Sequence, residues 1–299
     1  MVTSSSFQVD RVFHRVRNLT PELFEIKTSL SPKAFVGQGS YGKVFRSNRT
    51  KLITKEVPCD SLETFRHVVQ EILMQAICAN ETRSLINNPT YASIPPILAA
   101  TVTSHTFPLK LHVVTLDAGK PLADLQIRTK RDLAKVCGVV YQVANVIEFL
   151  QHKFKFCHRD VYGNNVLVRN QAGSTCTTAF KASLIDFGMA RMVYKGVVLA
   201  SNAYFPTSRF VPGFDMTLLL YRTFGERCVL ALTCKDTPSD FQKSIQELLR
   251  STGVKFEEVQ SVQDLYDFIE AKSVSKNTKM TPVHVKKLML QFAKTYCVD

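Results

Sequence analysis

Two acids and an amide lie beside short apolar segments in the middle of the chain. Residues 158–165 read H-R-D-V-Y-G-N-N, which places Asp160 and Asn165 in one loop. A second apolar segment ends at Asp186, which is followed by Phe and Gly. Phosphoryl transfer from a metal-bound nucleotide needs such a set, because one acid meets the acceptor hydroxyl while the other acid and the amide hold the metal. We therefore expect Asp160 to act on the acceptor, and Asn165 and Asp186 to bind Mg²⁺.

A glycine-rich segment lies far upstream of these acids. Residues 37–44 read G-x-G-x-x-G-x-V. Dinucleotide-binding folds use similar glycines, but there the glycines lead into a helix. Here Val44 continues into a strand, so the pattern predicts a hairpin whose backbone approaches phosphates closely. The residues expected to cover the nucleotide are Gly37, Gln38, Gly39, Ser40, Tyr41, Gly42 and Val44.

The next two elements offer a lysine and a glutamate for the same site. The strand over 51–57 contains two lysines, and Lys55 is preferred to Lys51 because it ends an apolar run. A helix over 61–79, with Asp60 as its expected N-cap, carries Glu71 at the flank of its apolar stripe. Lysines on strands and glutamates on helices are most often solvated. The neighbouring glycine pattern reverses that expectation, and we predict that Lys55 and Glu71 pair.

The pattern of elements predicts an α+β architecture with a strand-rich front and a helix-rich back. Residues 1–32 read as an N-terminal extension, 33–116 as a first lobe and 117–299 as a second lobe of one domain. A polar connector with Gly and Pro follows the strand over 109–116 and favours a lobe boundary there. The helices expected in the second lobe cover 129–153, 214–225, 239–251, 261–272 and 281–296.

The composition is that of a globular protein with a basic surface. Of the 299 residues 45% are hydrophobic, and 38 Lys and Arg face 25 Asp and Glu, which gives a net charge of +13. No apolar run approaches membrane-spanning length, and no aromatic-rich basic cluster indicates nucleic-acid binding. The eight cysteines show no C-x-x-C pair, so reduced thiols are expected. We expect a monomer without a membrane segment, located in the cytoplasm or the nucleus.

Taken together, the glycine pattern, Lys55, Glu71, H-R-D-x-x-x-x-N and D-F-G resemble the eukaryotic-type protein kinases over residues 33–225. The resemblance implies a two-lobed kinase fold with ATP and Mg²⁺ as cofactors. It implies that Lys55 contacts the α- and β-phosphates and that Asp160 accepts the proton of the substrate hydroxyl. It also implies that Asp117 or Asp124 reaches the ribose, and that Asp215 anchors the backbone of the H-R-D segment.

The chain departs from the usual protein-kinase pattern at two places. Serine/threonine kinases usually carry a lysine two residues after the catalytic acid, where this chain has Tyr162. No A-P-E sequence follows the D-F-G. The haspin-like branch is similar in lacking A-P-E, and it reads H-R-D-L-H-W-G-N where this chain has H-R-D-V-Y-G-N-N. The likeness suggests an atypical, compact kinase, and an origin in a large DNA virus is the expectation that follows from it.

Three functions remain open from the sequence. The first is an active Ser/Thr protein kinase with a protein substrate of unknown identity, because all five catalytic positions carry the usual residue type. The second is a small-molecule kinase, which would need no peptide platform and so no A-P-E. The third is a pseudokinase that binds partners, for which Tyr162 is the sole support. The retained Lys55, Asp160 and Asp186 favour the first.

Overall fold

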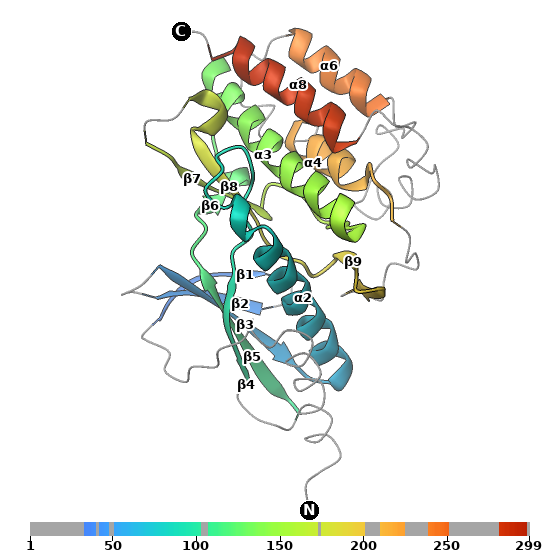
Figure 1. Ribbon diagram of the computed structural model, residues 1–299. Coiled ribbons are helices and arrows are strands. Elements are labelled where there is room, and N and C mark those ends of the chain that lie inside the picture. The colour runs from blue at the N-terminus through green and yellow to red at the C-terminus, as the bar shows by residue number, and fades with distance from the viewer. Residues whose placement is uncertain are drawn as a thin grey trace, which may run out of the picture.

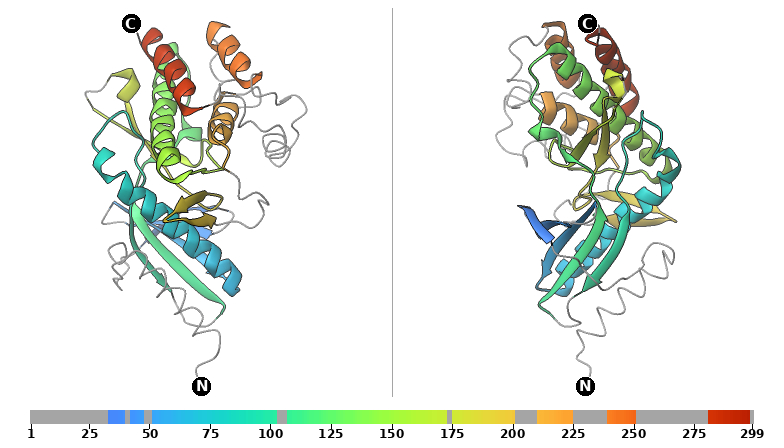
Figure 2. Two further views of the ribbon diagram at one scale, coloured as in Figure 1. Left: turned by 45° about the vertical axis from the view of Figure 1, so that its right-hand side comes forward. Right: turned by 90° about the vertical axis from the view of Figure 1, so that its left-hand side faces the viewer.

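The computed structural model describes most of the chain after residue 32. The described segments are 33–39, 42–47, 51–102, 107–172, 175–200, 210–224, 239–250 and 281–297. The predicted extension over 1–32, the loop residues Ser40 and Tyr41 and the predicted helix over 261–272 lie outside them. Figures 1 and 2 show a strand-rich part joined to a helical part. This two-lobed α+β architecture is the one expected from the sequence.

A five-stranded antiparallel sheet forms the first part. Its strands are β1 (Lys33–Gly39), β2 (Gly42–Ser47), β3 (Leu52–Cys59), β4 (Ile97–Val102) and β5 (Leu109–Leu116). The order across the sheet is β1-β2-β3-β5-β4, so β3 is the central strand. Helix α2 (Leu62–Glu81) lies beside this sheet (Figure 1).

The rotation of α2 about its axis is fixed by its apolar stripe. Phe65, Val68, Ile72 and Ala76 are all buried, as their helical spacing predicts. Each large side chain in such a position stabilises the fold by roughly 1.5–3 kcal/mol relative to an exposed one. Because this stripe must stay inside, the direction of the neighbouring Glu71 is fixed with it.

The N-cap of α2 is Ser61, not the expected Asp60. Ser61 has extended backbone angles, and its Oγ accepts the N–H of Thr64 at 3.2 Å. Serine and aspartate are both strong capping residues, so spacing alone does not choose between two neighbours. The predicted cap is therefore wrong by one residue.

Helix α3 (Lys130–Phe154) is the core helix of the second part. It begins with a capping box, in which the Thr129 and Asp132 side chains each accept the other's backbone N–H. The helix is long and apolar enough to cross a membrane, but 78% of its apolar window is buried within the fold. Around it lie α4 (Phe214–Phe224), α6 (Ser239–Arg250) and α8 (Pro282–Thr295), with α8 packed along α3 (Figures 1 and 2).

Short strands lie where the second part meets the first. A three-stranded sheet contains β6 (Lys120–Pro121), β7 (Val166–Asn170) and β8 (Phe180–Leu184), and β9 (Arg191–Tyr194) pairs with β10 (Val197–Ala200). The H-R-D loop connects α3 to β7, and the D-F-G segment connects β8 to β9. Since β7 and β8 are hydrogen-bonded neighbours, these two loops are brought together.

The cysteines only partly follow the expectation of reduced thiols. Cys176 and Cys297 form a disulfide that joins the β7–β8 connection to the end of the chain after α8. The prediction is wrong for this pair, because a contact between residues 121 positions apart leaves no spacing signal in the sequence. Four described cysteines are free and buried, namely Cys59, Cys78, Cys137 and Cys157. Burial raises the pKa of each of these thiols, which keeps them protonated and unreactive.

Candidate active site

The glycine pattern forms a hairpin, as predicted. Strands β1 and β2 pair antiparallel, with Gly37 opposite Val44 and Gly39 opposite Gly42. Gln38 is exposed on β1 opposite Lys43. Two paired strands that carry the glycines are the arrangement of a phosphate-covering loop, whereas a dinucleotide site needs a helix after the glycines.

Two of these glycines have different surroundings, and we expect their substitutions to separate stability from nucleotide binding. A Cβ on Gly42 would lie 2.3 Å from the carbonyl oxygen of Glu56, whereas a Cβ on Gly37 would meet nothing within 4 Å. Gly42→Ala should therefore cost roughly 1–3 kcal/mol of stability. Gly37→Ala should leave the melting temperature unchanged but weaken ATP binding, because a methyl group keeps the backbone away from phosphates.

Thermal unfolding and fluorescent-nucleotide titration of the two variants check this pair. Wild-type nucleotide affinity in Gly37→Ala would show that the β1–β2 hairpin does not cover the nucleotide. An unchanged melting temperature in Gly42→Ala would show that the hairpin moves freely away from β3.

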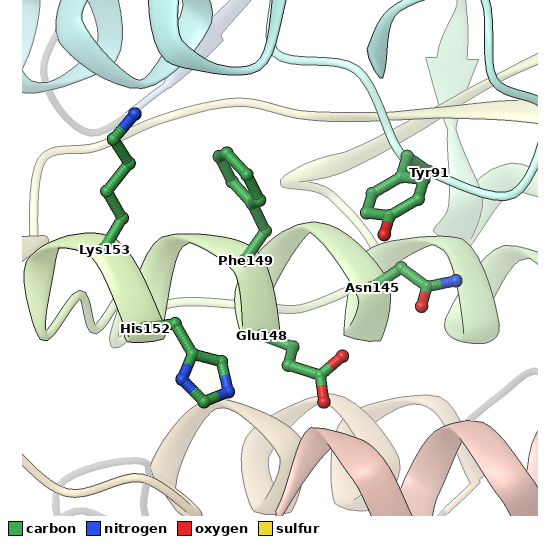
Figure 3. Close-up of a pocket in the computed structure, with 6 residues that line it drawn as sticks. All are labelled: Tyr91, Asn145, Glu148, Phe149, His152 and Lys153. Carbon is green, nitrogen blue, oxygen red and sulfur yellow. The ribbon is translucent and has the colours of Figure 1, made fainter. Parts of the chain in front are cut away.

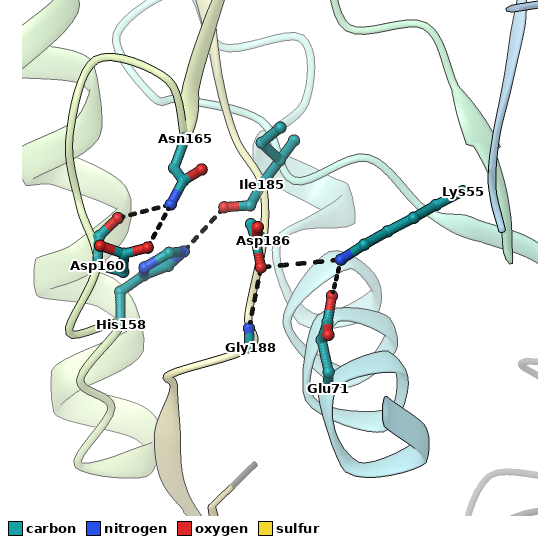
Figure 4. Close-up of polar contacts among 8 residues, drawn as sticks. All are labelled: Lys55, Glu71, His158, Asp160, Asn165, Ile185, Asp186 and Gly188. Atoms are coloured by element: carbon teal, nitrogen blue, oxygen red, sulfur yellow. Dashed lines mark hydrogen bonds and ion pairs between the residues drawn. The ribbon is translucent and has the colours of Figure 1, made fainter. Parts of the chain in front are cut away.

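Lys55 lies on the central strand and pairs with Glu71. Its Nζ is 2.8 Å from Oε1 of Glu71 and 3.9 Å from Oδ1 of Asp186 (Figure 4). Burial raises the pKa of the Glu71 carboxyl, and the Lys55 ammonium opposes this effect. Lys51 precedes β3 and is exposed. The structure therefore brings together Lys55, Glu71 and Asp186, which the sequence places on three different elements.

The H-R-D loop is held by a buried acid on α4. Asp215 accepts the backbone N–H of His158 at 2.9 Å and that of Arg159 at 2.7 Å, one on each carboxylate oxygen. Arg159 has a φ of 67°, in the left-handed region that non-glycine residues rarely adopt. Burial raises the pKa of Asp215 to about 6, while the two N–H donors oppose this rise. The anchoring role implied for Asp215 by the resemblance matches these two hydrogen bonds.

Asn165 fixes the position of Asp160. Its Nδ2 donates to the backbone oxygen of Asp160 at 2.9 Å and to the Oδ2 atom of Asp160 at 2.8 Å (Figure 4). Because its nitrogen is used in this way, the amide oxygen of Asn165 points to the other side of the group. The side chain of Asp160 is 25% exposed, so an acceptor hydroxyl can approach it from solvent.

His158 supports the loop from inside the core. Its ring is fully buried and packs against Phe187 and Phe156, with ring centroids 5.1 and 6.2 Å away. Burial lowers the pKa of His158 to about 4. The imidazole is therefore neutral near pH 7, and its Nε2–H donates to the carbonyl oxygen of Ile185 at 3.1 Å. This bond ties the H-R-D loop to the D-F-G segment.

The low pKa of His158 predicts a loss of stability in mild acid. The unfolded chain binds a proton at His158 below about pH 6.5, whereas the folded chain does so only near pH 4. The free energy of unfolding should therefore fall by up to about 3 kcal/mol between these values through His158 alone. His158→Gln retains an N–H donor near Ile185 but does not titrate.

Urea unfolding of the wild type and of His158→Gln at several pH values tests this expectation. The stability advantage of the wild type should shrink as the pH falls from about 7 to about 4. Asp215 and the other titrating groups are common to both proteins, so they cancel in the difference. An advantage that stays constant with pH would contradict a neutral, buried His158.

Asp186 and Asn165 have the chemistry of a magnesium site. Asp186 has a φ of 63° and its Oδ1 accepts the N–H of Gly188 at 3.3 Å. The N–H of Ile185 donates to the Asn165 carbonyl at 3.0 Å, so the two candidate ligands come from neighbouring segments (Figure 4). Within the described segments no group of three His, Cys, Asp or Glu side chains could hold a metal. Magnesium bound with a nucleotide needs only one or two protein ligands beside phosphate oxygens, which these residues fit.

Asp117, the residue expected near the ribose, already has partners. Nε of Arg46 lies 2.9 Å from its Oδ2, and the N–H of Gly119 donates to its Oδ1 at 2.9 Å. A carboxylate oxygen can accept more than one hydrogen bond, so a ribose contact stays a prediction. The alternative, Asp124, is exposed at the end of a short 3₁₀ helix (Leu122–Asp124).

Arg222 also lies at the site, and no motif or spacing in the sequence marks it. It comes from α4, and its Nη1 is 3.8 Å from Oδ1 of Asp160. Its guanidinium carbon also lies 4.4 Å from the centroid of the Tyr162 ring. Burial and the nearby Asp160 carboxylate raise the pKa of the Tyr162 hydroxyl, which stays protonated.

A separate pocket lies over α3 and contains none of these residues. It is lined by Tyr91, Asn145, Glu148, Phe149, His152 and Lys153 (Figure 3). Two of its charged groups are already paired, Glu148 with Lys286 and Lys153 with Glu81. The chemistry of the molecule therefore centres on the loops after α3 and β8.

The chain matches a family model. It is described as the haspin-like kinase domain, and it covers residues 7–215, which is more than half of the chain. The matched segment contains the glycine hairpin, Lys55, Glu71, both acid-bearing loops and Asp215. Arg222 lies beyond its end. No curated protein matches the chain.

Proposed function

Because this chain belongs to the haspin-like kinase domain family and is an atypical eukaryotic-type protein kinase, we propose that it phosphorylates serine and threonine hydroxyls of proteins. ATP with Mg²⁺ is the proposed phosphate donor. The observation that supports this most is the assembly of Lys55, Glu71 and Asp186 next to the pair formed by Asp160 and Asn165 (Figure 4). We propose one kinase domain with lobes 33–116 and 117–299.

Each residue has one task in this proposal. A bound nucleotide would supply the phosphoryl group, and the bound Mg²⁺ would neutralise charge on the phosphates. Lys55, oriented by Glu71, binds the phosphates, and Asn165 and Asp186 hold the metal. Asp160 orients the acceptor hydroxyl and takes its proton, because its carboxylate is fixed by Asn165 and remains open to solvent.

The two alternative functions have less support. A pseudokinase usually lacks the lysine or a metal-binding acid, whereas Lys55 and Asp186 are present and lie within 3.9 Å of each other. A small-molecule kinase was suggested by the missing A-P-E, but the family to which the chain belongs is one of protein kinases. Neither alternative is favoured by a contact at the site.

The oligomeric state of the enzyme, its location and the kind of its substrate are also proposals. We propose a monomer that acts on protein substrates in the cytoplasm or the nucleus, with neither a membrane nor a nucleic acid as its partner. The basic surface, with a net charge of +13, fits an acidic protein substrate. An origin in a large DNA virus stays a prediction from the sequence.

A phosphorylation assay in cell lysate tests the proposed function. The wild-type protein is added to heat-treated lysate with labelled ATP, and with either Mg²⁺ or an excess of chelator. Metal-dependent label on serine and threonine is the expected result. Parallel reactions contain sugar and aminoglycoside acceptors. Label on these acceptors alone would replace the protein kinase by a small-molecule kinase, and no label with any acceptor would favour a pseudokinase.

A further inference from the structure

Helix α4 contacts the acid-bearing loop at two points. Asp215 in its first turn binds the backbone of residues 158 and 159, and Arg222 lies seven residues later on the same helix. Residues seven apart share one face of an α-helix. One face of α4 therefore holds both the backbone and the side chains of the loop.

The contacts of Arg222 are with the side chains of the loop. Its Nη1 is 3.8 Å from Oδ1 of Asp160, while Oδ2 of Asp160 accepts from Asn165. The Asp160 carboxylate is thus held at one oxygen by an amide and at the other by a cation. The guanidinium carbon lies over the Tyr162 ring, 4.4 Å from its centroid, which is a cation–π contact. Both charged side chains are mostly buried, with 21% of Arg222 and 25% of Asp160 exposed.

The contact between Arg222 and Asp160 matters because of the charge of residues 160–165. Residues 160–165 read Asp-Val-Tyr-Gly-Asn-Asn and contain no cation. Lys55 is on the opposite side of the site, bound to Glu71 and near Asp186 (Figure 4). Negative charge on the transferring phosphoryl group is stabilised by cations that are already in place. On the acceptor side, a guanidinium beside Asp160 can supply that charge.

We propose that Arg222 is a positioning residue for phosphate transfer. Braced on the Tyr162 ring, its guanidinium fixes the Asp160 carboxylate and brings positive charge to the acceptor side of the loop. This inference rests on the proposed kinase function. It assigns to helix α4 the supply of a cation that residues 160–165 do not contain.

Kinetics of four single variants, and of the double variant that combines Arg222→Gln with Tyr162→Leu, test this assignment. Arg222→Gln should lower kcat by about ten- to a hundredfold, with KM for ATP and the melting temperature nearly unchanged. Arg222→Lys should recover part of the loss, because it restores the charge. Tyr162→Leu should also lower kcat. Its effect should not add to that of Arg222→Gln, because both substitutions break the same contact between the guanidinium and the ring. Arg250→Gln on α6, an exposed position, removes the same charge and serves as the control.

Chemical rescue separates a functional cation from packing. Arg222→Ala should regain activity when guanidinium ion is added at millimolar concentration, but not with urea or sodium chloride at the same concentration. Wild-type kcat in Arg222→Gln would overturn the proposal. A loss matched by a lower melting temperature, or rescued equally by urea, would overturn it as well and leave a structural role. A wild-type protein without any transfer would overturn the kinase function itself, and this inference with it.

Discussion

Asp160→Asn is expected to lower the rate of phosphate transfer by about 10²- to 10⁴-fold, which is the usual contribution of a positioned general base. Asparagine has the same shape and can still accept the bond from Asn165 with its amide oxygen. It cannot take a proton from the substrate hydroxyl. Nucleotide affinity should therefore stay at the wild-type value, because Asp160 pairs with Asn165 on the other side of the site from Lys55 and Glu71 (Figure 4).

Asp186→Ala should also abolish transfer, but by a different route. It removes the carboxylate that lies 3.9 Å from Lys55 and one of the two proposed metal ligands. The pair formed by Lys55 and Glu71, at 2.8 Å, stays in place. ATP binding should therefore lose most of its dependence on Mg²⁺ without being lost completely.

Nucleotide titration with and without Mg²⁺, beside steady-state kinetics, distinguishes the two variants. Equal nucleotide binding in Asp160→Asn and in the wild type, together with a lost metal response in Asp186→Ala, supports the assigned roles. Transfer at the wild-type rate by Asp160→Asn would remove Asp160 from the chemistry. A full metal response in Asp186→Ala would place the metal elsewhere.

Features set by neighbouring residues were predictable from the sequence. The capping box of α3 depends on Thr129 and Asp132, three residues apart, and both of its bonds are present. The hairpin of the glycine pattern could be told from a dinucleotide loop because Val44 continues a strand. The pairing of Lys55 with Glu71 could also be predicted from the sequence. The apolar run before Lys55 and the stripe on α2 each fix the direction of one side chain.

Contacts between segments far apart in the sequence could not be predicted from the spacing of residues. Arg222 meets Tyr162 and Asp160 only because α4 packs against the loop, and nothing near Arg222 in the sequence marks it. The same holds for the pairing of Arg46 with Asp117 and for the disulfide of Cys176. In each case a local pattern fixes the element, while tertiary packing decides which side chain it meets.

Asp215→Ala is expected to lower the free energy of unfolding by about 2–4 kcal/mol and kcat by about 10²-fold. Two buried N–H groups, of His158 and Arg159, would lose their acceptor, at about 1–3 kcal/mol each. The total should stay below the sum, because the buried carboxylate is itself costly, as its raised pKa of about 6 shows. The effect on kcat follows from geometry. Without its anchor, the left-handed backbone at Arg159 can relax and displace Asp160.

Asp215→Asn and Thr217→Ala complete this test. Asn keeps one acceptor oxygen and turns the other into a donor, so its stability and kcat should lie between those of the wild type and the Ala variant. Thr217 is buried on the same helix, and its hydroxyl donates to the Gly213 carbonyl at 2.8 Å. Thr217→Ala should cost about 1 kcal/mol and leave kcat unchanged. Kinetics well below each melting temperature, beside urea unfolding, measure both effects. If the Asp215 variants lose stability but keep kcat, the backbone of the loop holds its shape without α4, and the anchor serves the fold alone.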